Sequence, residues 1–220
     1  MAQYFNKLSS NAATFADLMN GFGVVTVMNA KIYEFDKATM NNTAEAIRDA
    51  FATKEALAEI DTLKVANVTV EGPDKTITGG QYSNPLIKYG KSARLEMQDA
   101  LGSAKAIEAF GGSINEYEES TFEKVAAMHI TEDFASAKTI IGDSFFIDRK
   151  SGQQVKVNVV FYQVQPDSIF NLTQDAEGDA TVFDMNADLL VTDIKMNDEA
   201  GTVHGVFYSI IPAATTKVSE

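Results

Sequence analysis

The clearest feature of the first third of the chain is an alternation of apolar and polar residues, which is typical of half-buried strands. It runs over residues 31–36, and it returns from Lys64, where Ala66, Val68 and Val70 share one face. Between these two stretches the apolar spacing lengthens to that of a helix. The changes of period predict a strand, a helix and a second strand, in that order.

The predicted helix covers residues 43–60, a segment rich in Ala and Glu with apolar residues at helical spacing. Asn42 and Glu45 are suitable residue types for a capping pair at its start. We expect the apolar stripe of this helix to pack on a sheet. A second, short helix is predicted from Asp99 to Phe110, where two glycines follow and end it.

Most of the remaining chain has the period of strands. Strand-like stretches lie at residues 75–78, 86–97, 126–130, 140–147, 155–164, 169–173, 182–192 and 202–211. The sequence Asp148-Arg-Lys-Ser-Gly152 is typical of a hairpin turn between two of them. The pattern predicts a mainly β (α+β) fold, a two-sheet β-sandwich or partial barrel with one long helix and one short helix. We expect a single domain over residues 1–220, with an N-terminal arm to about residue 25 and a C-terminal tail from about residue 212.

Turn-forming residues are dense between Gly72 and Gly90. Residues 72–74 end the preceding strand, and residues 75–78 are interpreted as its return. We predict that this region is a projecting hairpin or loop that contacts a neighbouring subunit, with an ordinary surface loop as the alternative. The candidate contact residues are Gly79, Gly80, Tyr82, Leu86 and Ile87.

The chain is acidic, with a formal net charge of −13, and residues 151–220 alone carry 3 basic and 10 acidic side chains. Because contacts to phosphates need Lys or Arg, this balance argues against a protein that grips nucleic acid. The absence of cysteine fits a reducing cytoplasm. The N-terminal residues lack the pattern of a signal peptide, and the apolar stretches are too short to span a bilayer. We expect a soluble protein that does not bind membranes.

Residues that carry catalytic or metal chemistry are sparse. His129 and His204 are the only histidines, and each lies in a strand-like stretch without a zinc-protease or nucleophile-elbow motif. Gly79-Gly80 lacks the Lys and the Ser or Thr of a phosphate-binding loop. The carboxylates within residues 175–179 lack the glycine and glutamate positions of an EF-hand. We predict no catalytic residue, no cofactor and no metal, and hence a protein that is not an enzyme.

Two segments resemble a known family. Residues 89–101, Tyr-Gly-Lys-Ser-Ala-Arg-Leu-Glu-Met-Gln-Asp-Ala-Leu, are similar to a pattern found in the major tail tube proteins of long-tailed, siphovirus-like bacteriophages. Residues 170–185, which contain Ala-Glu-Gly-Asp-Ala-Thr-Val-Phe-Asp, resemble a later segment of the same family, and the hairpin turn at residues 148–152 is also similar. The resemblance covers residues 64–192, whereas the first 60 residues and the last 25 do not match.

The resemblance implies a structural subunit that forms hexameric rings, stacked into a hollow tail tube through which viral DNA passes. Its partners would be copies of itself and other tail proteins, such as the tape measure and the tail terminator, with DNA only as transported cargo. Such a protein is made in the cytoplasm of the host bacterium and resides in the virion tail. Tailocin tubes and type VI-like secretion tubes share this architecture and remain alternatives. A monomeric β-sandwich that acts as a binding or adhesion module is the alternative from a different class.

The acidic strand at residues 182–192 has two distinct faces. Its apolar set is Phe183, Met185, Ala187, Leu189 and Val191. The opposite face carries Asp184, Asn186 and Asp188, because successive side chains of a strand point to opposite sides. If the apolar face packs in the core, the polar stripe meets water, either on the outer wall of a tube or in its lumen. These three residues are the candidate lumen-facing set.

Overall fold

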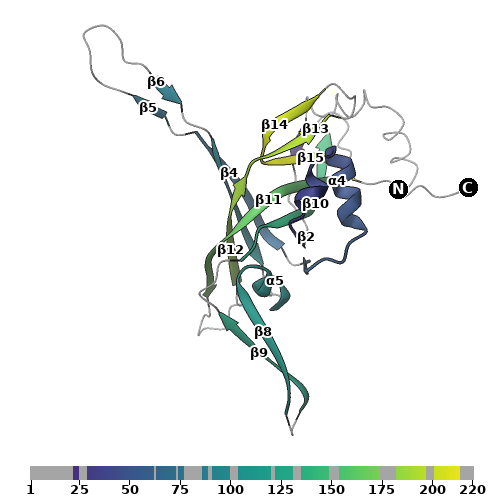
Figure 1. The fold of residues 1–220 in the computed structure, drawn as a ribbon, viewed down its shortest axis with the longest axis vertical. Helices are drawn as coiled ribbons and strands as arrows, with labels where there is room; N and C mark the ends of the chain where they lie inside the picture. Colours follow the sequence, from purple (N-terminus) through teal and green to yellow (C-terminus); the bar gives the residue numbers. More distant parts are fainter. Residues whose placement is uncertain are drawn as a thin grey trace, which may run out of the picture.

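The computed structural model describes residues 22–24, 29–61, 63–72, 74–76, 86–88, 91–99, 104–119, 122–130, 135–148, 154–173, 182–196 and 201–213 (Figure 1). The predicted mainly β class is confirmed, since a large antiparallel sheet dominates the fold and the helices are few. Most of the expected N-terminal arm and C-terminal tail lies outside the described residues.

Nine of the described strands belong to one antiparallel sheet. Along its main path the order is β3 (Ala58–Ile60), β2 (Asn29–Glu34), β10 (Lys138–Asp148), β11 (Gln154–Thr173), β12 (Val182–Leu190), β7 (Ser92–Asp99) and β4 (Leu63–Glu71). Two more strands join from the side: β1 (Phe22–Val24) pairs with β10, and β15 (Tyr208–Pro212) pairs with β11.

The long strand β11 links two halves of this sheet. Residues 154–164 pair with β10, whereas residues 163–173 pair with β12, and the register shifts between Pro166 and Phe170. We call β3, β2, β10, β15 and residues 154–164 of β11 the helix-covered half. The polar half consists of residues 165–173 of β11 together with β12, β7 and β4. The strand expected at residues 169–173 is therefore the end of β11 and not a separate element.

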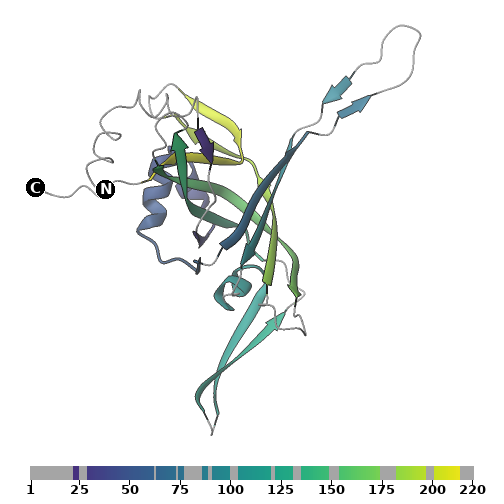
Figure 2. The same cartoon turned by 180° about the vertical axis from the view of Figure 1, so that it is seen from behind.

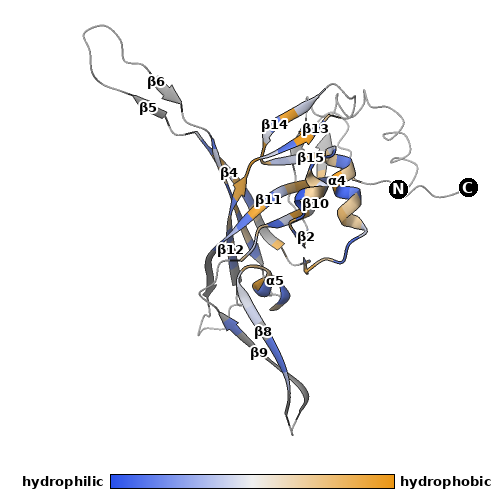
Figure 3. Ribbon diagram, in the orientation of Figure 1, coloured by the Kyte–Doolittle hydropathy of each residue, from blue (hydrophilic) through white to orange (hydrophobic). Residues whose placement is uncertain are grey.

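The main core lies between the two halves of the sheet. The helix-covered half contributes Ile32, Ile140 and Phe161, and the polar half contributes Leu95 and Met185, all of them buried. The helix α5 (Ala104–Ala109) also contributes buried residues to this cluster. The expected two-sheet sandwich thus takes the form of one continuous sheet that folds over its own core. Figure 3 shows hydrophobic and hydrophilic positions alternating along its strands.

A second core lies on the outer side of the helix-covered half, where α4 (Ala44–Ala52) packs (Figure 1). Ile47 and Phe51 of α4 are fully buried against Tyr162 and its neighbours. The helix begins at Thr43, whose Oγ1 accepts a hydrogen bond from the backbone N–H of Ala46 at 3.3 Å. The chain therefore has the layer order helix, sheet, core, sheet.

The predicted extension of this helix to residue 60 is wrong, because α4 ends at Ala52. Residues 58–60 form the strand β3, in which Ala58 and Ile60 are buried and the residue between them is exposed. The pairing of β3 with β2 satisfies backbone N–H and C=O groups along this edge of β2. The expected cap is also corrected, since Thr43 caps the helix and the Asn42 side-chain amide donates to the carbonyl of Thr39 at 3.1 Å.

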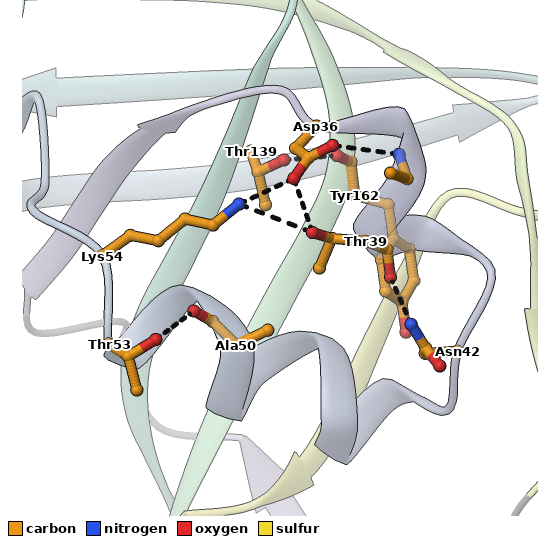
Figure 4. Close-up of polar contacts among 9 residues, drawn as sticks. Asp36, Thr39, Asn42, Ala50, Thr53, Lys54, Thr139 and Tyr162 are labelled. Carbon is orange, nitrogen blue, oxygen red and sulfur yellow. Dashed lines mark hydrogen bonds and ion pairs between the residues drawn. The ribbon is translucent and has the colours of Figure 1, made fainter.

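A polar cluster joins the short helix α3 (Lys37–Met40) to the residues that follow α4 (Figure 4). Asp36 accepts hydrogen bonds from the Ala38 backbone N–H at 3.0 Å, the Thr39 hydroxyl at 2.7 Å and the Lys54 ammonium at 2.8 Å. The Lys54 ammonium and the two other donors hold the pKa of the Asp36 carboxyl well below its usual range. The cluster fixes both ends of the helical layer to each other.

Three two-stranded sheets complete the described part of the fold: β5 (Asp74–Thr76) with β6 (Leu86–Lys88), β8 (Gly112–Glu119) with β9 (Phe122–Ile130), and β13 (Thr192–Lys195) with β14 (Thr202–Val206). The sequence did not predict β8. The expected strand at residues 202–211 is in fact β14 and β15, which are interrupted at Phe207. The second predicted helix is present as α5, but Asp99 is the last residue of β7 and does not cap it.

Candidate functional site

The acidic strand β12 has the two faces that its sequence predicts as far as Leu189. The predicted place of Val191 on the apolar face is wrong, because Val191 lies beyond the end of β12 and exposes 54% of its surface. Met185, Ala187 and Leu189 are buried in the main core. Asp184 and Asn186 lie on the opposite face, and the structure leaves them partly exposed. Asp188, on that same face, is exposed, so the three candidate residues form a polar stripe on the water-facing side of the polar half.

The neighbouring strands extend this stripe into a polar surface. On β7, Gln98 lies opposite Asp184, Glu96 opposite Asn186, and Arg94 opposite Asp188. On β4, Asn67 and Thr69 are exposed at the positions that pair with Glu96 and Arg94. The alternation of buried and exposed side chains is shared by three paired strands, so their polar residues gather on one side.

Two side-chain contacts fix part of this surface. The Gln98 amide Nε2 donates a hydrogen bond to Asp184 Oδ1 at 2.8 Å, across the β7–β12 pair. The Arg94 guanidinium forms an ion pair with Asp167 of β11, with 2.9 Å between Nη2 and Oδ2. Arg94 also lies opposite Asp188 in the ladder. The polar half is therefore held by contacts that cross its strands as well as by the backbone ladder.

The surface is acidic. Its described carboxylates are Glu71, Glu96, Asp167, Asp184 and Asp188, and its described cation is Arg94. One guanidinium cannot neutralise five carboxylates, so the described side chains of this face carry a net negative charge. Sequence reasoning found only the β12 part of it, because the contributions of β7 and β4 depend on which strands pair.

Both edges of the polar half are open within the described part of the chain. The strand β4 is the last strand of the main path and bonds to β7 alone. Residues 166–173 of β11 bond to β12 on one side, while the pairing of β10 with β11 ends at Val164. Each edge presents backbone N–H and C=O groups that another strand can pair with.

The candidate contact region at residues 72–90 is in part outside the described residues, and this applies to Gly79, Gly80 and Tyr82. Leu86 and Ile87 lie on β6, opposite Thr76 and Lys75 of β5. The prediction that residues 75–78 return along the preceding strand is wrong. Instead β4 pairs with β7, and β5 pairs with β6. The β5–β6 pair thus comes after the β4–β7 pair along the same two chain segments, and Figures 1 and 2 show β5 and β6 projecting beyond the main sheet.

A second projection, the β8–β9 ribbon, was not recognised from the sequence. It leaves the body next to α5, at the end of the molecule opposite to β5 and β6 (Figures 1 and 2). At its base, a Cβ added to Gly112 would lie 2.8 Å from Ile107 Cγ2 and 3.0 Å from the Ile107 carbonyl oxygen. Glycine thus allows the ribbon to start in close contact with α5.

The two histidines lie on exposed positions of strands. His129 is on β9, and His204 is on β14, where its Nδ1 lies 2.9 Å from Asp193 Oδ2. The His204 ring and the backbone N–H of Gly205 lower the pKa of the Asp193 carboxyl. Among the described residues, no three His, Cys, Asp or Glu side chains are grouped as metal ligands would be. The acidic turn at residues 175–179 lies outside the described residues.

The family models and the curated proteins provide no relative for this chain. No model of a known protein family matches the chain, and no curated protein matches it. None of the described helices has the length and apolar character of a membrane span. The features of the fold that bear on function are the polar half of the sheet, its open edges and the two projections.

Proposed function

We propose that this chain is the structural subunit of a hollow tube, in which copies form hexameric rings that stack into a phage tail tube for the passage of DNA. The observation that carries the proposal is the polar half of the sheet, which combines an acidic, water-facing surface with an open strand at each edge. The two motifs similar to tail tube proteins lie on this half: residues 92–99 of the first form β7, and the second spans the end of β11 and the start of β12.

The directions of the strands support head-to-tail assembly. Successive neighbours from β11 through β12 and β7 to β4 are antiparallel, so β11 and β4 run in opposite directions. If one copy is rotated about an axis roughly parallel to the strands, its β11 edge meets the β4 edge of the next copy as an antiparallel pair. A contact of this heterologous kind closes into a ring when the rotation divides a full turn evenly.

The size of such a ring suits its cargo. Four strands spaced about 4.8 Å apart occupy about 19 Å, so six copies give a circumference of about 115 Å and a backbone diameter of about 37 Å. A strand tilt of about 40° raises this diameter to about 48 Å. A barrel of this width leaves a channel for duplex DNA after the inner side chains are placed.

The charge of the polar face suits the passage of DNA. DNA carries about one negative charge per 1.7 Å of its axis, and a basic wall would hold it by releasing counterions. A wall lined by Asp184, Asp188 and their neighbours repels phosphates at short range, and salt screens this repulsion beyond about 8–10 Å. The proposed partners are copies of this chain and the other tail proteins, with the virion tail as the site of function.

The first test is the assembly state of the purified chain. We expect rings and tubes by negative-stain microscopy, and large species by sedimentation velocity. A protein that stays monomeric at all concentrations contradicts the proposal and favours a monomeric binding module.

The second test concerns the wall of the lumen. Tubes of the variant Asp184→Lys, Asp188→Lys, assembled in the presence of duplex DNA, should retain DNA that is protected from nuclease, whereas wild-type tubes should not. The matched control, Glu55→Lys, Asp61→Lys, changes the charge equally at two exposed positions near β3. If tubes of the first variant retain DNA but nuclease degrades that DNA, the stripe lies on the outer wall and not in the lumen.

A further inference from the structure

The two projections lie at opposite ends of the longest axis of the molecule. Figures 1 and 2 show the β5–β6 pair beyond one end of the main sheet and the β8–β9 ribbon beyond the other. Neither pair is hydrogen-bonded to the main sheet in the described part of the chain. An isolated two-stranded hairpin is at best marginally stable in water. Each projection therefore gains stability from any surface that packs against it.

The β8–β9 ribbon is long, and most of its described side chains are exposed. At about 3.4 Å per residue, its eight-residue strand β8 spans about 27 Å. Its pairing runs from Gly112 opposite Ile130 to Glu119 opposite Phe122. On β8, Asn115 and Glu116 are exposed, and Tyr117 exposes 47% of its surface. A ribbon with an exposed ring beside carboxylates is suited to a partner that offers cations and apolar contacts.

The charges of the two projections are opposite in sign. Residues 112–130 contain four Glu and one Lys, a net charge of −3. The strands β5 and β6 contain two Lys and one Asp, a net charge of +1, and Lys91 lies just before β7, in a chain whose total is −13. The local excess of positive charge in an acidic chain lies at the end of the molecule that is opposite to the acidic ribbon. Two copies placed end to end along the long axis bring these segments toward each other.

We infer that the β8–β9 ribbon of one copy docks on the β5–β6 projection of a second copy that follows it along the long axis. This inference rests on the proposed tube and identifies the contact that stacks one ring on the next. The occupant is a second copy of this chain, since its own opposite end supplies the complementary charge. The contact is heterologous, so it repeats without closing and produces a filament with a defined direction.

Charge reversal in both directions tests the inference. The first variant changes Lys75, Lys88 and Lys91 to Glu, and the second changes Glu116, Glu118 and Glu119 to Lys. Each alone should still form rings but raise the concentration needed for tubes by about tenfold or more, because like charges then face each other across the contact. The combined variant restores opposite charges and should form tubes at nearly the wild-type concentration.

The control variant changes Glu55 and Asp61 to Lys, which adds positive charge at two exposed positions outside both projections. It should form tubes like the wild type. Circular dichroism checks that each variant is folded, and a salt titration of the wild type gives a measurement without mutation. Tube formation should weaken from low to high salt, since screening reduces the attraction between exposed charges.

Three results overturn the inference: single variants that stack like the wild type, a folded combined variant that does not recover, or tube formation that is independent of salt. The proposed function fails in a different way, since the wild-type chain would then form neither rings nor tubes at any concentration.

Discussion

The attachment of α4 to the sheet can be tested at Phe51. Its side chain is fully buried, its ring lies 5.3 Å from the ring of Tyr33, and Lys54 Nζ lies 4.7 Å from its centre. Phe-to-Ala changes in cores cost about 3–5 kcal/mol in the free energy of unfolding. The aromatic pair contributes about 0.5–1.5 kcal/mol and an exposed cation–π contact about 0.5–1 kcal/mol, and these contributions are not fully additive. We expect Phe51→Ala to lower the free energy of unfolding by about 4 kcal/mol.

Urea unfolding followed by far-ultraviolet circular dichroism measures this change, because the chain has no tryptophan to serve as a fluorescent reporter. The protein is kept below the concentration at which it assembles, so that assembly does not add to its stability. Leu57→Ala is the control, since Leu57 is 40% exposed and should lose less than about 1.5 kcal/mol. A loss below about 1.5 kcal/mol for Phe51→Ala would show that α4 is not packed on the sheet as described.

Two further predictions concern single sites. Burial raises the pKa of Tyr162 to about 12. The native state therefore keeps the phenol proton, whereas the unfolded state loses it from about pH 10. The free energy of unfolding should fall by about 2–3 kcal/mol between pH 10 and 12. Tyr162→Phe should reduce this alkaline loss in urea titrations at several pH values, and an identical loss in both proteins would refute the assignment. Gly112→Ala should lower the free energy of unfolding by about 1–3 kcal/mol because of the close contact with Ile107. Gly72→Ala should be tolerated, because an added Cβ would lie 3.7 Å from Lys91 Cγ, and thermal unfolding of the two variants checks this difference.

The parts of the fold that the sequence predicts are those with a local signal. The stripe on β12 follows from a strict two-residue alternation, which burial of Met185 and exposure of Asp188 preserve. The hairpin between β10 and β11 follows from two apolar strands around a polar turn. The predicted start of the helix near residue 43 is confirmed by α4, although Thr43 and not Asn42 caps it. In each case neighbouring residues contain enough information to specify the element.

The errors arise where a distant segment decides the structure. Residues 53–60 have helix-forming side chains, but β2 supplies a partner that makes Ala58 and Ile60 an edge strand. The interruption expected before residue 169 is absent because β11 continues through a register shift next to Pro166, beside an edge that no described strand pairs with. The strand β8 has a weak alternation because much of it is exposed, so its pairing with β9 was not visible.

The order of strands in the main sheet has a consequence for synthesis on the ribosome. Asn29 of β2 pairs with Asp143 of β10, and the polar half needs β12, which ends at Leu190. At about 5–20 residues per second, roughly 6–23 s pass between the synthesis of Asn29 and that of its partner. During this interval β2 has no strand of the main path beside it except the short β3. The main sheet therefore forms only when most of the chain has been made, and nascent chains that stall before β10 expose a strand edge to one another.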